Sequence, residues 1–237
     1  MASASSETDY EQTARHRPIR SFVRREGRMT DAQKRALESL HDRYGIPADG
    51  GLIDMDRLFG RRAPVILEIG FGNGESLAAM AADHPQRNYI GIEVHRPGVG
   101  HLLNRIEALG LENLRVICRD ANEVLRQQVP DDSLAGVQLY FPDPWPKKRH
   151  HKRRIVQPPW VGRIHGKLAR GGFLHMATDW EDYALHMRDV MEAEPGFTNT
   201  AGSGKFLDGR GERPETKFER RGLNRGHGVW DLIYTRR

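Results

Sequence analysis

The sequence predicts an α/β fold in which helices cover both faces of a mostly parallel, doubly wound sheet. From Pro64 onward, nearly continuous apolar runs alternate with helical stretches, which is the pattern of strands buried on both faces. The chain has 237 residues, of which 38% are hydrophobic and 29% charged, so it can bury a full core. We expect one domain over residues 30–237, preceded by a flexible basic arm over residues 1–29.

The first element expected is a helix that starts at Thr30. The sequence Thr-Asp-Ala-Gln has the form of a capping box, in which the first and fourth residues bond reciprocally. Apolar residues then recur on one helix face at Ala36, Leu37, Leu40 and Tyr44. Gly45 is expected to end the helix.

Five apolar runs are predicted to be strands, at residues 64–70, 88–94, 114–118, 134–141 and 171–178. Five helices are predicted between and after them, at residues 74–83, 96–109, 121–129, 158–169 and 181–194. Pro158 and Pro159 stand at a predicted helix start, where proline is tolerated. At the C-terminal end, residues 229–237 alternate between apolar and polar in the manner of a strand.

Positive charge is concentrated in two segments of the chain. Lysines and arginines total 37 against 32 aspartates and glutamates, a net charge of +5. Residues 15–28 hold six arginines and one acid, and residues 147–154 hold six lysines and arginines and no acid. Without these two segments the chain is net acidic. Such concentrated positive charge suits a polyanionic partner.

Several classes of protein are excluded by the same sequence. The single cysteine, Cys118, rules out an intramolecular disulfide and a cysteine-rich zinc site. His150 and His151 are adjacent and lie among six cations, so we expect no metal there. No run approaches the ~20 apolar residues needed to cross a bilayer, and residues 1–10 lack the apolar core of a secretion signal. We expect a cytoplasmic protein without membrane contact.

A glycine turn follows the first predicted strand, and acidic residues stand at the ends of the first four strands. Gly70 and Gly72 allow the backbone to turn sharply and to approach a ligand closely. The acids are Glu68, Glu93, Asp120 and Asp143. In open α/β sheets, ligands bind outside the carboxyl ends of the strands. We therefore expect these residues to surround one ligand.

The four acids predict a cationic ligand. The dinucleotide-binding fingerprint would need glycine at position 75, where the chain has Glu75, and carboxylates repel a pyrophosphate. S-adenosylmethionine fits better, because it carries a sulfonium, an ammonium and a ribose diol that suits Glu93. The spacing from Gly70 to Glu93 is typical of the interval between a glycine turn and a ribose-binding acid. The competing interpretation is an atypical dehydrogenase.

The segment 141–154, with the sequence FPDPWPKKRHHKRR, indicates the acceptor. Asp143 lies between two prolines, which restrict the backbone around it. Trp145 offers a flat surface on which a base can stack, and a cationic run follows it. A carboxylate, an aromatic ring and cations in one segment favour methyl transfer to a base of a nucleic acid. The alternative is a solvated charged loop with a buried tryptophan.

These motifs resemble those of the bacterial tRNA (guanine-N7-)-methyltransferase family. The resemblance covers roughly residues 50–237 and rests on EIGFGNG, GIEVHRPGVG, FPDPWPKKRHHKRR, HMATDW and the elements from RPETKFERRG through HGVWDL. It implies a Rossmann-like class I methyltransferase fold with a seven-stranded sheet. It also implies S-adenosyl-L-methionine as the donor and the variable-loop guanine of tRNA as the acceptor, with N7-methylguanosine as the product.

The resemblance also implies roles for individual residues. The cofactor-binding residues are Glu68, Gly70, Gly72, Glu93, Asp120 and Asp143, and Asp143 is also the catalytic residue. The substrate-binding residues are Lys147, Asp179, Thr216, Lys217, Phe218 and Glu219. The RNA-binding residues are Arg149, His150, His151, Lys152, Arg153 and Arg154. Two of the substrate-binding residues have a structural alternative: Asp179 could be the cap of the next helix, and Phe218 could be part of the core.

Two other functions compete with this interpretation. A base amino-methyltransferase also places an Asx-Pro-Pro-aromatic element after its fourth strand, but here Asp143-Pro144-Trp145 has one proline before the aromatic residue. A non-catalytic RNA-binding module would not need four acids at a ligand edge. We expect tRNA as the partner, no obligate protein partner, and either a monomer or a homodimer.

Overall fold

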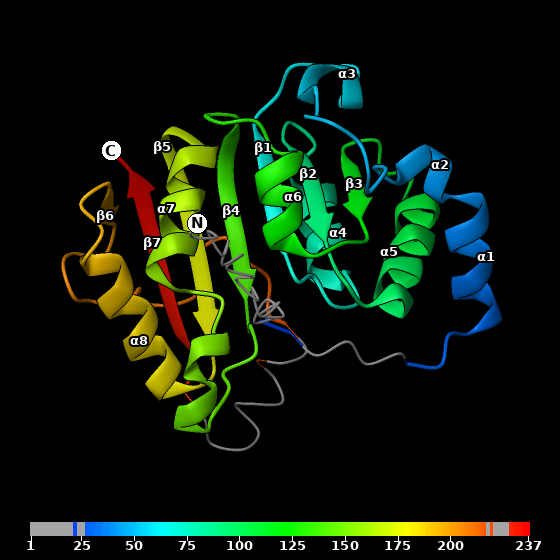
Figure 1. The fold of residues 1–237 in the computed structure, drawn as a ribbon. Coiled ribbons are helices and arrows are strands. Elements are labelled where there is room, and N and C mark those ends of the chain that lie inside the picture. The colour runs from blue at the N-terminus through cyan, green and yellow to red at the C-terminus, as the bar shows by residue number, and fades with distance from the viewer. Residues whose placement is uncertain (1–20, 23–26, 217–218, 220–227) are drawn as a thin grey trace, which may run out of the picture.

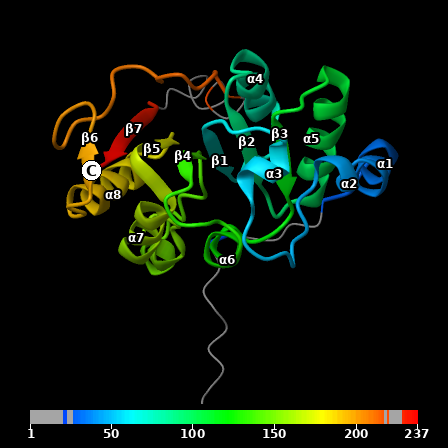
Figure 2. The same cartoon turned by 90° about the horizontal axis from the view of Figure 1, so that it is seen from above.

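A twisted sheet runs through the middle of the molecule, with helices on both of its faces (Figures 1 and 2). The computed structural model describes residues 21–22, 27–216, 219 and 228–237, and these residues form a seven-stranded sheet in the order β3-β2-β1-β4-β5-β7-β6. The strands are β1 (Val65–Ile69), β2 (Asn88–Ile92), β3 (Leu114–Ile117), β4 (Leu134–Tyr140), β5 (Leu168–Thr178), β6 (Phe197–Asn199) and β7 (Trp230–Arg236). β1 to β5 are parallel, whereas β7 is antiparallel to both of its neighbours. The predicted doubly wound α/β fold is confirmed.

The helices divide into two layers. They are α1 (Asp31–Ser39), α2 (His41–Tyr44), α3 (Met55–Phe59), α4 (Glu75–Asp83), α5 (Arg96–Leu109), α6 (Ala121–Gln127), α7 (Pro158–Lys167) and α8 (Glu181–Glu192), together with a 3-10 helix, Lys148–Arg153. One buried cluster joins α6, α7 and α8 to one face of the sheet, and a second joins α1, α4 and α5 to the other face. Within the described part of the chain, no helix is both long and apolar enough to cross a membrane.

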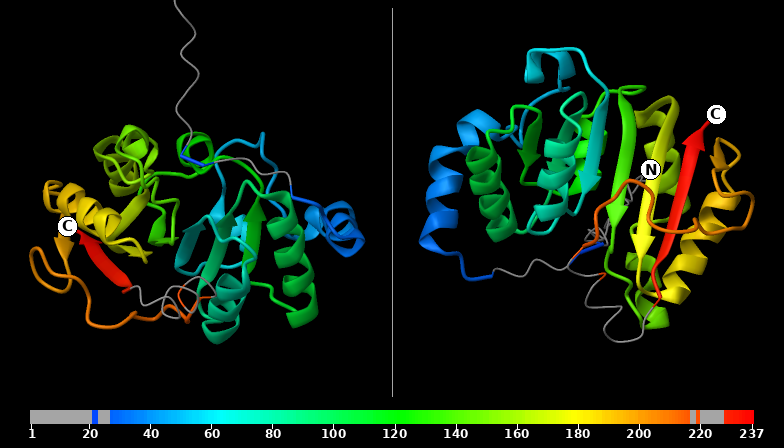
Figure 3. Two further views of the ribbon diagram at one scale, coloured as in Figure 1. Left: turned by 90° about the horizontal axis from the view of Figure 1, so that it is seen from below. Right: turned by 180° about the vertical axis from the view of Figure 1, so that it is seen from behind.

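The segment between β6 and β7 takes the place of a helix on part of the second face. Residues 200–216 run across β7 and β5 on the side of the sheet that carries α4 and α5 (Figures 2 and 3). The backbone N–H of Leu207 donates to the carbonyl oxygen of Asp231 in β7, at 2.8 Å. This segment ends near the carboxyl ends of β1 and β4, beside the site described below.

The predicted elements are confirmed, with shifts at their ends. The capping box forms at Thr30, whose hydroxyl accepts from the Gln33 N–H while the Gln33 side chain accepts from the Thr30 N–H. That first helix is interrupted at Leu40, so that α1 and α2 are separate. The helix predicted over 158–169 ends at Lys167, because Leu168 already pairs with Leu134 as the start of β5. The short elements α3, β6 and the 3-10 helix were not predicted.

The reversal of strand order places a crevice between β1 and β4. From β1, the chain proceeds to β2 and β3 on one side, and then returns to β4 and β5 on the other side. At such a switch point the two crossovers leave in opposite directions, and the carboxyl ends of the strands border an open space. The fold therefore predicts a ligand site outside Ile69 and Tyr140.

Gly98 in α5 packs directly against the glycine turn that follows β1. A Cβ atom on Gly98 would stand 2.1 Å from the carbonyl oxygen of Gly72, well inside van der Waals contact. By contrast, a Cβ atom on Gly162, which is an exposed position of α7, would meet no described atom within 4 Å. The two helical glycines therefore differ in what surrounds them.

We expect Gly98→Ala to lower the free energy of unfolding by about 1–3 kcal/mol, since the added methyl group overpacks the contact with Gly72. Gly162→Ala, the same exchange in open space, is expected to raise it by about 0.5–1 kcal/mol through better helix propensity. Urea unfolding followed by circular dichroism compares the two variants. Equal effects in both would contradict the contact between α5 and the glycine turn.

Candidate active site

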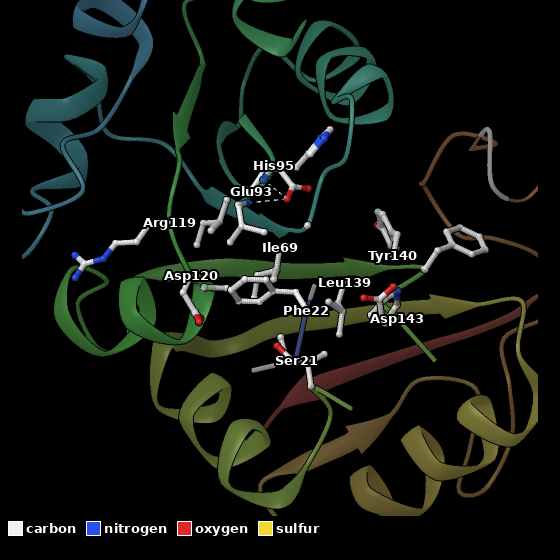
Figure 4. Close-up of a pocket in the computed structure, with 17 residues that line it drawn as sticks. Ser21, Phe22, Ile69, Glu93, His95, Arg119, Asp120, Leu139, Tyr140 and Asp143 are labelled. Carbon is white, nitrogen blue, oxygen red and sulfur yellow. Dashed lines mark hydrogen bonds between the residues drawn. The ribbon is translucent and has the colours of Figure 1, made fainter. Parts of the chain in front are cut away.

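Two adjoining cavities lie at the switch point, outside the carboxyl ends of β1, β2 and β4. The larger has a volume of about 450 Å³ and the smaller about 400 Å³. Residues common to both linings are Gly70, Glu93, His95, Tyr140 and Phe141. Figure 4 shows the larger cavity with its lining residues. The shared residues show that the two cavities adjoin each other at the carboxyl-end edge of the sheet.

The glycine turn forms one wall of the site. Gly70, Gly72 and Gly74 have φ angles of 77°, 61° and 74°, in the left-handed region that favours glycine. The Gly70 N–H donates to the carbonyl oxygen of Ile92 at 2.8 Å, which ties the end of β1 to β2. Gly70 and Gly72 therefore add no side chain to this wall of the smaller cavity.

Glu93 holds the glycine turn from the end of β2. One carboxylate oxygen accepts from the Gly72 N–H at 2.9 Å. The other accepts from the Val94 N–H at 2.6 Å and the His95 N–H at 2.9 Å. These three backbone bonds fix the carboxylate at the border of both cavities.

Glu68 is a buried carboxyl at the wall of the smaller cavity. Glu68 is 3% exposed, and its Oε2 atom has no hydrogen-bond partner among the described residues. Burial, followed by the nearby charge of Glu93, raises the pKa of Glu68 from 4.5 to about 8. At pH 7 the free protein therefore holds Glu68 mainly in its protonated form. A cation in the smaller cavity would favour the ionised form instead.

Asp120 and Asp143 line the larger cavity. Asp120 is the N-cap of α6, and its carboxylate accepts from the Asn122 N–H at 2.8 Å. Asp143 is exposed and follows the end of β4, between Pro142 and Pro144. The structure thus brings all four predicted acids to the walls of the two cavities.

The loop that carries Asp143 has a strained backbone. Phe141 and Trp145, on either side of it, have φ angles of 50° and 46°, and a left-handed conformation costs a residue with a side chain about 1–2 kcal/mol. Such strain persists where surrounding contacts hold it. Arg154 supplies one such contact, because its Nε donates to the carbonyl oxygen of Pro144 at 2.9 Å.

Arg154 points into the protein. Its side chain is 1% exposed, and its guanidinium pairs with Asp182 and lies 4.8 Å from the centre of the Tyr183 ring. The hydrogen bond from Arg154 lowers the pKa of Asp182. The expectation that Arg154 contacts RNA is therefore corrected: its charge is used inside the protein, to hold the Asp143 loop.

Trp145 is covered on one side. The Arg153 guanidinium lies 4.0 Å from the centre of its ring, and its indole N–H donates to the carbonyl oxygen of Ser21 at 3.1 Å. It lines neither cavity. The described contacts give no support to the expectation that a base stacks on Trp145.

Residues of the predicted N-terminal arm belong to the site, which the sequence did not indicate. Ser21 and Phe22 line the larger cavity, where Figure 4 shows the Phe22 ring near Ile69 and Asp120. A Cβ atom on Gly27 would lie 3.0 Å from Nε2 of His95. The apolar Phe22 among arginines was the signal that could have suggested a buried contact.

Comparison with known proteins shows which sequences this chain resembles. The family described as "Putative methyltransferase" matches residues 62–232. A protein of Alkalilimnicola ehrlichii named tRNA (guanine-N(7)-)-methyltransferase is 66% identical, over 93% of this chain and 94% of its own. A protein of the same name from Alcanivorax borkumensis is 59% identical, over 93% and 92%.

The chain belongs to the tRNA (guanine-N7-)-methyltransferase family. Among solved structures, the 16S rRNA methyltransferase KamB is similar, with a TM-score of 0.58 and 17% identity over 79% of this chain and 95% of KamB. The aminoglycoside resistance methyltransferase NpmB1 has a TM-score of 0.53 and 16% identity, over 81% and 98%. Both likenesses concern the fold alone, and both agree with the predicted class I methyltransferase fold.

The remaining predicted residues of this methyltransferase differ in their exposure and in whether they line one of the two cavities. Lys147, Arg149 and Lys152 are exposed, and His150, His151 and Arg153 are half-buried. Thr216 lines the smaller cavity, whereas Lys147 and Asp179 line neither of the two. Lys217 and Phe218 lie outside the described residues.

Among the described residues, no group of three or more His, Cys, Asp or Glu could hold a metal ion.

The structure decides the structural alternative for Asp179 and shows the surroundings of Glu219. Asp179 is not the cap of α8, because Trp180 occupies the N-cap position. Glu219 is 4% exposed and turns inward, where its carboxylate accepts from Arg213 at 2.5 Å. The spacing from Thr216 to Glu219 has the form of a capping box, a signal that would have predicted an engaged carboxylate.

The raised pKa of Glu68 predicts how the stability of the ligand-free enzyme changes with pH. Between pH 4.5 and about 8 the folded state keeps a proton that the unfolded state has lost, so stability falls as the pH rises. The slope from this group reaches about 1.4 kcal/mol per pH unit. Glu68→Gln should remove that slope, and Glu75→Gln, at an exposed position of the same wall, should keep it.

Urea unfolding at pH 5.5, 7 and 8.5 provides the measurement. An identical pH dependence in wild type and Glu68→Gln would show that Glu68 is ionised in the free protein.

Proposed function

We propose that this chain transfers a methyl group from S-adenosyl-L-methionine to N7 of a guanine in the variable loop of tRNA. The observation that carries the proposal is the 66% identity, over 93% of the chain, with a relative named tRNA (guanine-N(7)-)-methyltransferase. The geometry of the two cavities supports the same donor and leaves room for a base beside Asp143.

The residues present fit S-adenosylmethionine. Glu68 offers a buried oxygen without a described partner to a cationic group. A Cβ atom on Gly70 or Gly72 would meet no described atom within 4 Å, so the turn leaves open space for a ligand. Glu93 and Asp120 would hold the ribose and the adenine end. When bound, the donor supplies a methyl group that is activated by the sulfonium charge.

The chain's own residues have a limited chemical task. Guanine N7 carries a lone pair and no proton, so methylation there needs no general base. The protein must align N7 with the methyl carbon, which removes much of the entropic barrier. Asp143 would accept hydrogen bonds from the guanine N1–H and amino group. Its negative charge stabilises the positive charge that grows on the purine.

The cationic 3-10 helix supplies the surface for the tRNA backbone. Exposed cations at Lys147, Lys148, Arg149 and Lys152 lie within nine residues of Asp143 in the chain. Contacts of this kind bind phosphates and set the position of the nucleic acid without reading its bases. A cytoplasmic location, the absence of an obligate protein partner, and a monomeric or homodimeric state stay predictions.

The proposal is tested with a labelled donor. Purified enzyme is incubated with methyl-labelled S-adenosylmethionine and unmodified tRNA, and the digested product is identified by mass spectrometry. N7-methylguanosine from the variable loop is expected. Methylation of an adenine or cytosine amino group would favour the amino-methyltransferase, and tRNA binding without transfer would favour the non-catalytic module.

Asp143→Asn should lower the single-turnover rate by about 10²–10³-fold, because it removes the charge that faces the developing cation. The tRNA dissociation constant should stay within about threefold, since phosphate contacts dominate affinity. Asp42→Asn, at an exposed position of α2, serves as the control and should match wild type. A near-normal rate in Asp143→Asn would exclude this role.

Alanine variants at Arg154 and Arg149 are expected to have different effects, the first on the free energy of unfolding and the second on tRNA binding. Arg154→Ala should lower the free energy of unfolding by about 1–3 kcal/mol through the lost charged hydrogen bonds. It should leave the slope of log Kd against log salt unchanged. Arg149→Ala should lower that slope by about 0.7–0.9, with little effect on stability. A reduced slope in folded Arg154→Ala would return Arg154 to the RNA-binding surface.

A further inference from the structure

A buried polar network links the end of β4 to the segment that precedes β7. Its members are each 7% exposed or less, and they are Tyr140, His175, Asp231, Arg213 and Glu219. Of these residues, Tyr140 lines both cavities, whereas His175, Asp231 and Arg213 line neither. Buried ionic groups are retained only when their partners are well placed, so the purpose of this network calls for an explanation.

Arg213 is the centre of the network. Its Nε and one Nη atom donate to the two carboxylate oxygens of Asp231, at 2.6 and 2.7 Å. The other Nη atom donates to Glu219 at 2.5 Å. The planar guanidinium thus joins two carboxylates through different edges, which a lysine ammonium does not reproduce.

The Asp231 side of the network is rigid. Asp231 lies in β7 opposite Ala177 of β5, and it also accepts from Nε2 of His175 at 2.8 Å. That bond leaves Nδ1 of His175 to accept from the Tyr140 hydroxyl at 3.1 Å. Residues of three neighbouring strands, β4, β5 and β7, therefore hold one edge of the guanidinium.

The Glu219 side of the network reaches the smaller cavity. The Glu219 carboxylate accepts from the Thr216 N–H at 3.4 Å, and the Glu219 N–H donates to the Thr216 hydroxyl at 3.1 Å. This reciprocal pair of bonds has the form of a capping box and ties Thr216 to Glu219. Thr216 lines the smaller cavity, so the network ends at the site.

Arg213 also lies beneath the aromatic residues that the two cavities share. Its guanidinium carbon is 5.4 Å from the centre of the Phe141 ring and 5.9 Å from that of Tyr140. Burial opposes the charge of Asp231, but the bonds from Arg213 and His175 outweigh it and lower the pKa of Asp231. The pKa of Arg213 is correspondingly raised by its two carboxylates, against its own burial. The ion pairs therefore stay charged.

We propose that Arg213 is a positioning residue for the acceptor base, because it holds Thr216 at the wall of the smaller cavity by bridging Glu219 to Asp231. This inference rests on the proposed function. The glycine turn and Glu93 are held by bonds of their own, so loss of the bridge should affect the acceptor side of the site and spare the donor side.

The main variant is Arg213→Lys, which keeps the charge and loses the bridge. The matched control is Arg210→Lys, because Arg210 lies 3.6 Å from the same Glu219 carboxylate but its side chain is 40% exposed. In Arg213→Lys, kcat for tRNA methylation is expected to fall at least tenfold, with the donor Kd within twofold of wild type. Hydrogen exchange at the amides of Thr216 and Glu219 should accelerate. Arg210→Lys should change none of these quantities.

A second variant guards against a folding defect. Asp231→Asn keeps the side-chain shape in β7 and weakens the bridge from the opposite side. It should show the same separation of kcat from donor Kd, whereas Asp231→Glu should recover part of the rate. All assays use protein that binds one donor per chain, so that only folded molecules are counted.

The outcomes are decisive in both directions. Wild-type kcat and wild-type exchange rates in Arg213→Lys would overturn the inference, as would a donor Kd that rises by the same factor as kcat falls. If wild type itself does not methylate tRNA, the proposed function fails, and the exchange rates at Thr216 and Glu219 still decide whether Arg213 holds the turn.

Discussion

The reversal of strand order between β1 and β4 is the constraint on which the site depends. Because the crossovers leave these two strands in opposite directions, nothing from the sheet fills the space above their carboxyl ends. Both cavities lie in that space, and Glu68, Glu93 and Asp143 reach it from consecutive positions in the sheet order. An acidic pocket for a cationic ligand follows from the topology and from the residues at three strand ends.

Two buried arginines hold the loops that complete this pocket. Arg154 binds the carbonyl oxygen of Pro144 and the carboxylate of Asp182, and Arg213 bridges Asp231 and Glu219. In both cases the several donors of one guanidinium join two separate segments of the chain. Glu68 in the same pocket differs, because its Oε2 atom has no hydrogen-bond partner among the described residues. The charges of the two arginines are paired within the protein, whereas the Glu68 carboxyl is left to interact with a ligand.

The N-terminal arm connects this pocket with the basic surface. Ser21 accepts a hydrogen bond from Trp145, whose ring also carries the Arg153 guanidinium. Phe22 lines the larger cavity together with Asp120 and Asp143. One short stretch of the arm therefore touches both the cationic segment and the acidic pocket, so that binding at one of them is physically adjacent to binding at the other.

The sequence by itself determined the strands other than β6, most of the helices, the Thr30 capping box and the acids at the strand ends. Each of these follows from local periodicity or from a short spacing along the chain. Only the tertiary structure decided that Arg154 turns inward and that Phe22 enters the cavity. The sequence of a charged run does not indicate whether one of its side chains is exposed to solvent or pairs with a buried partner. The direction of the Arg154 side chain is set by Asp182, which lies 28 residues further along the chain.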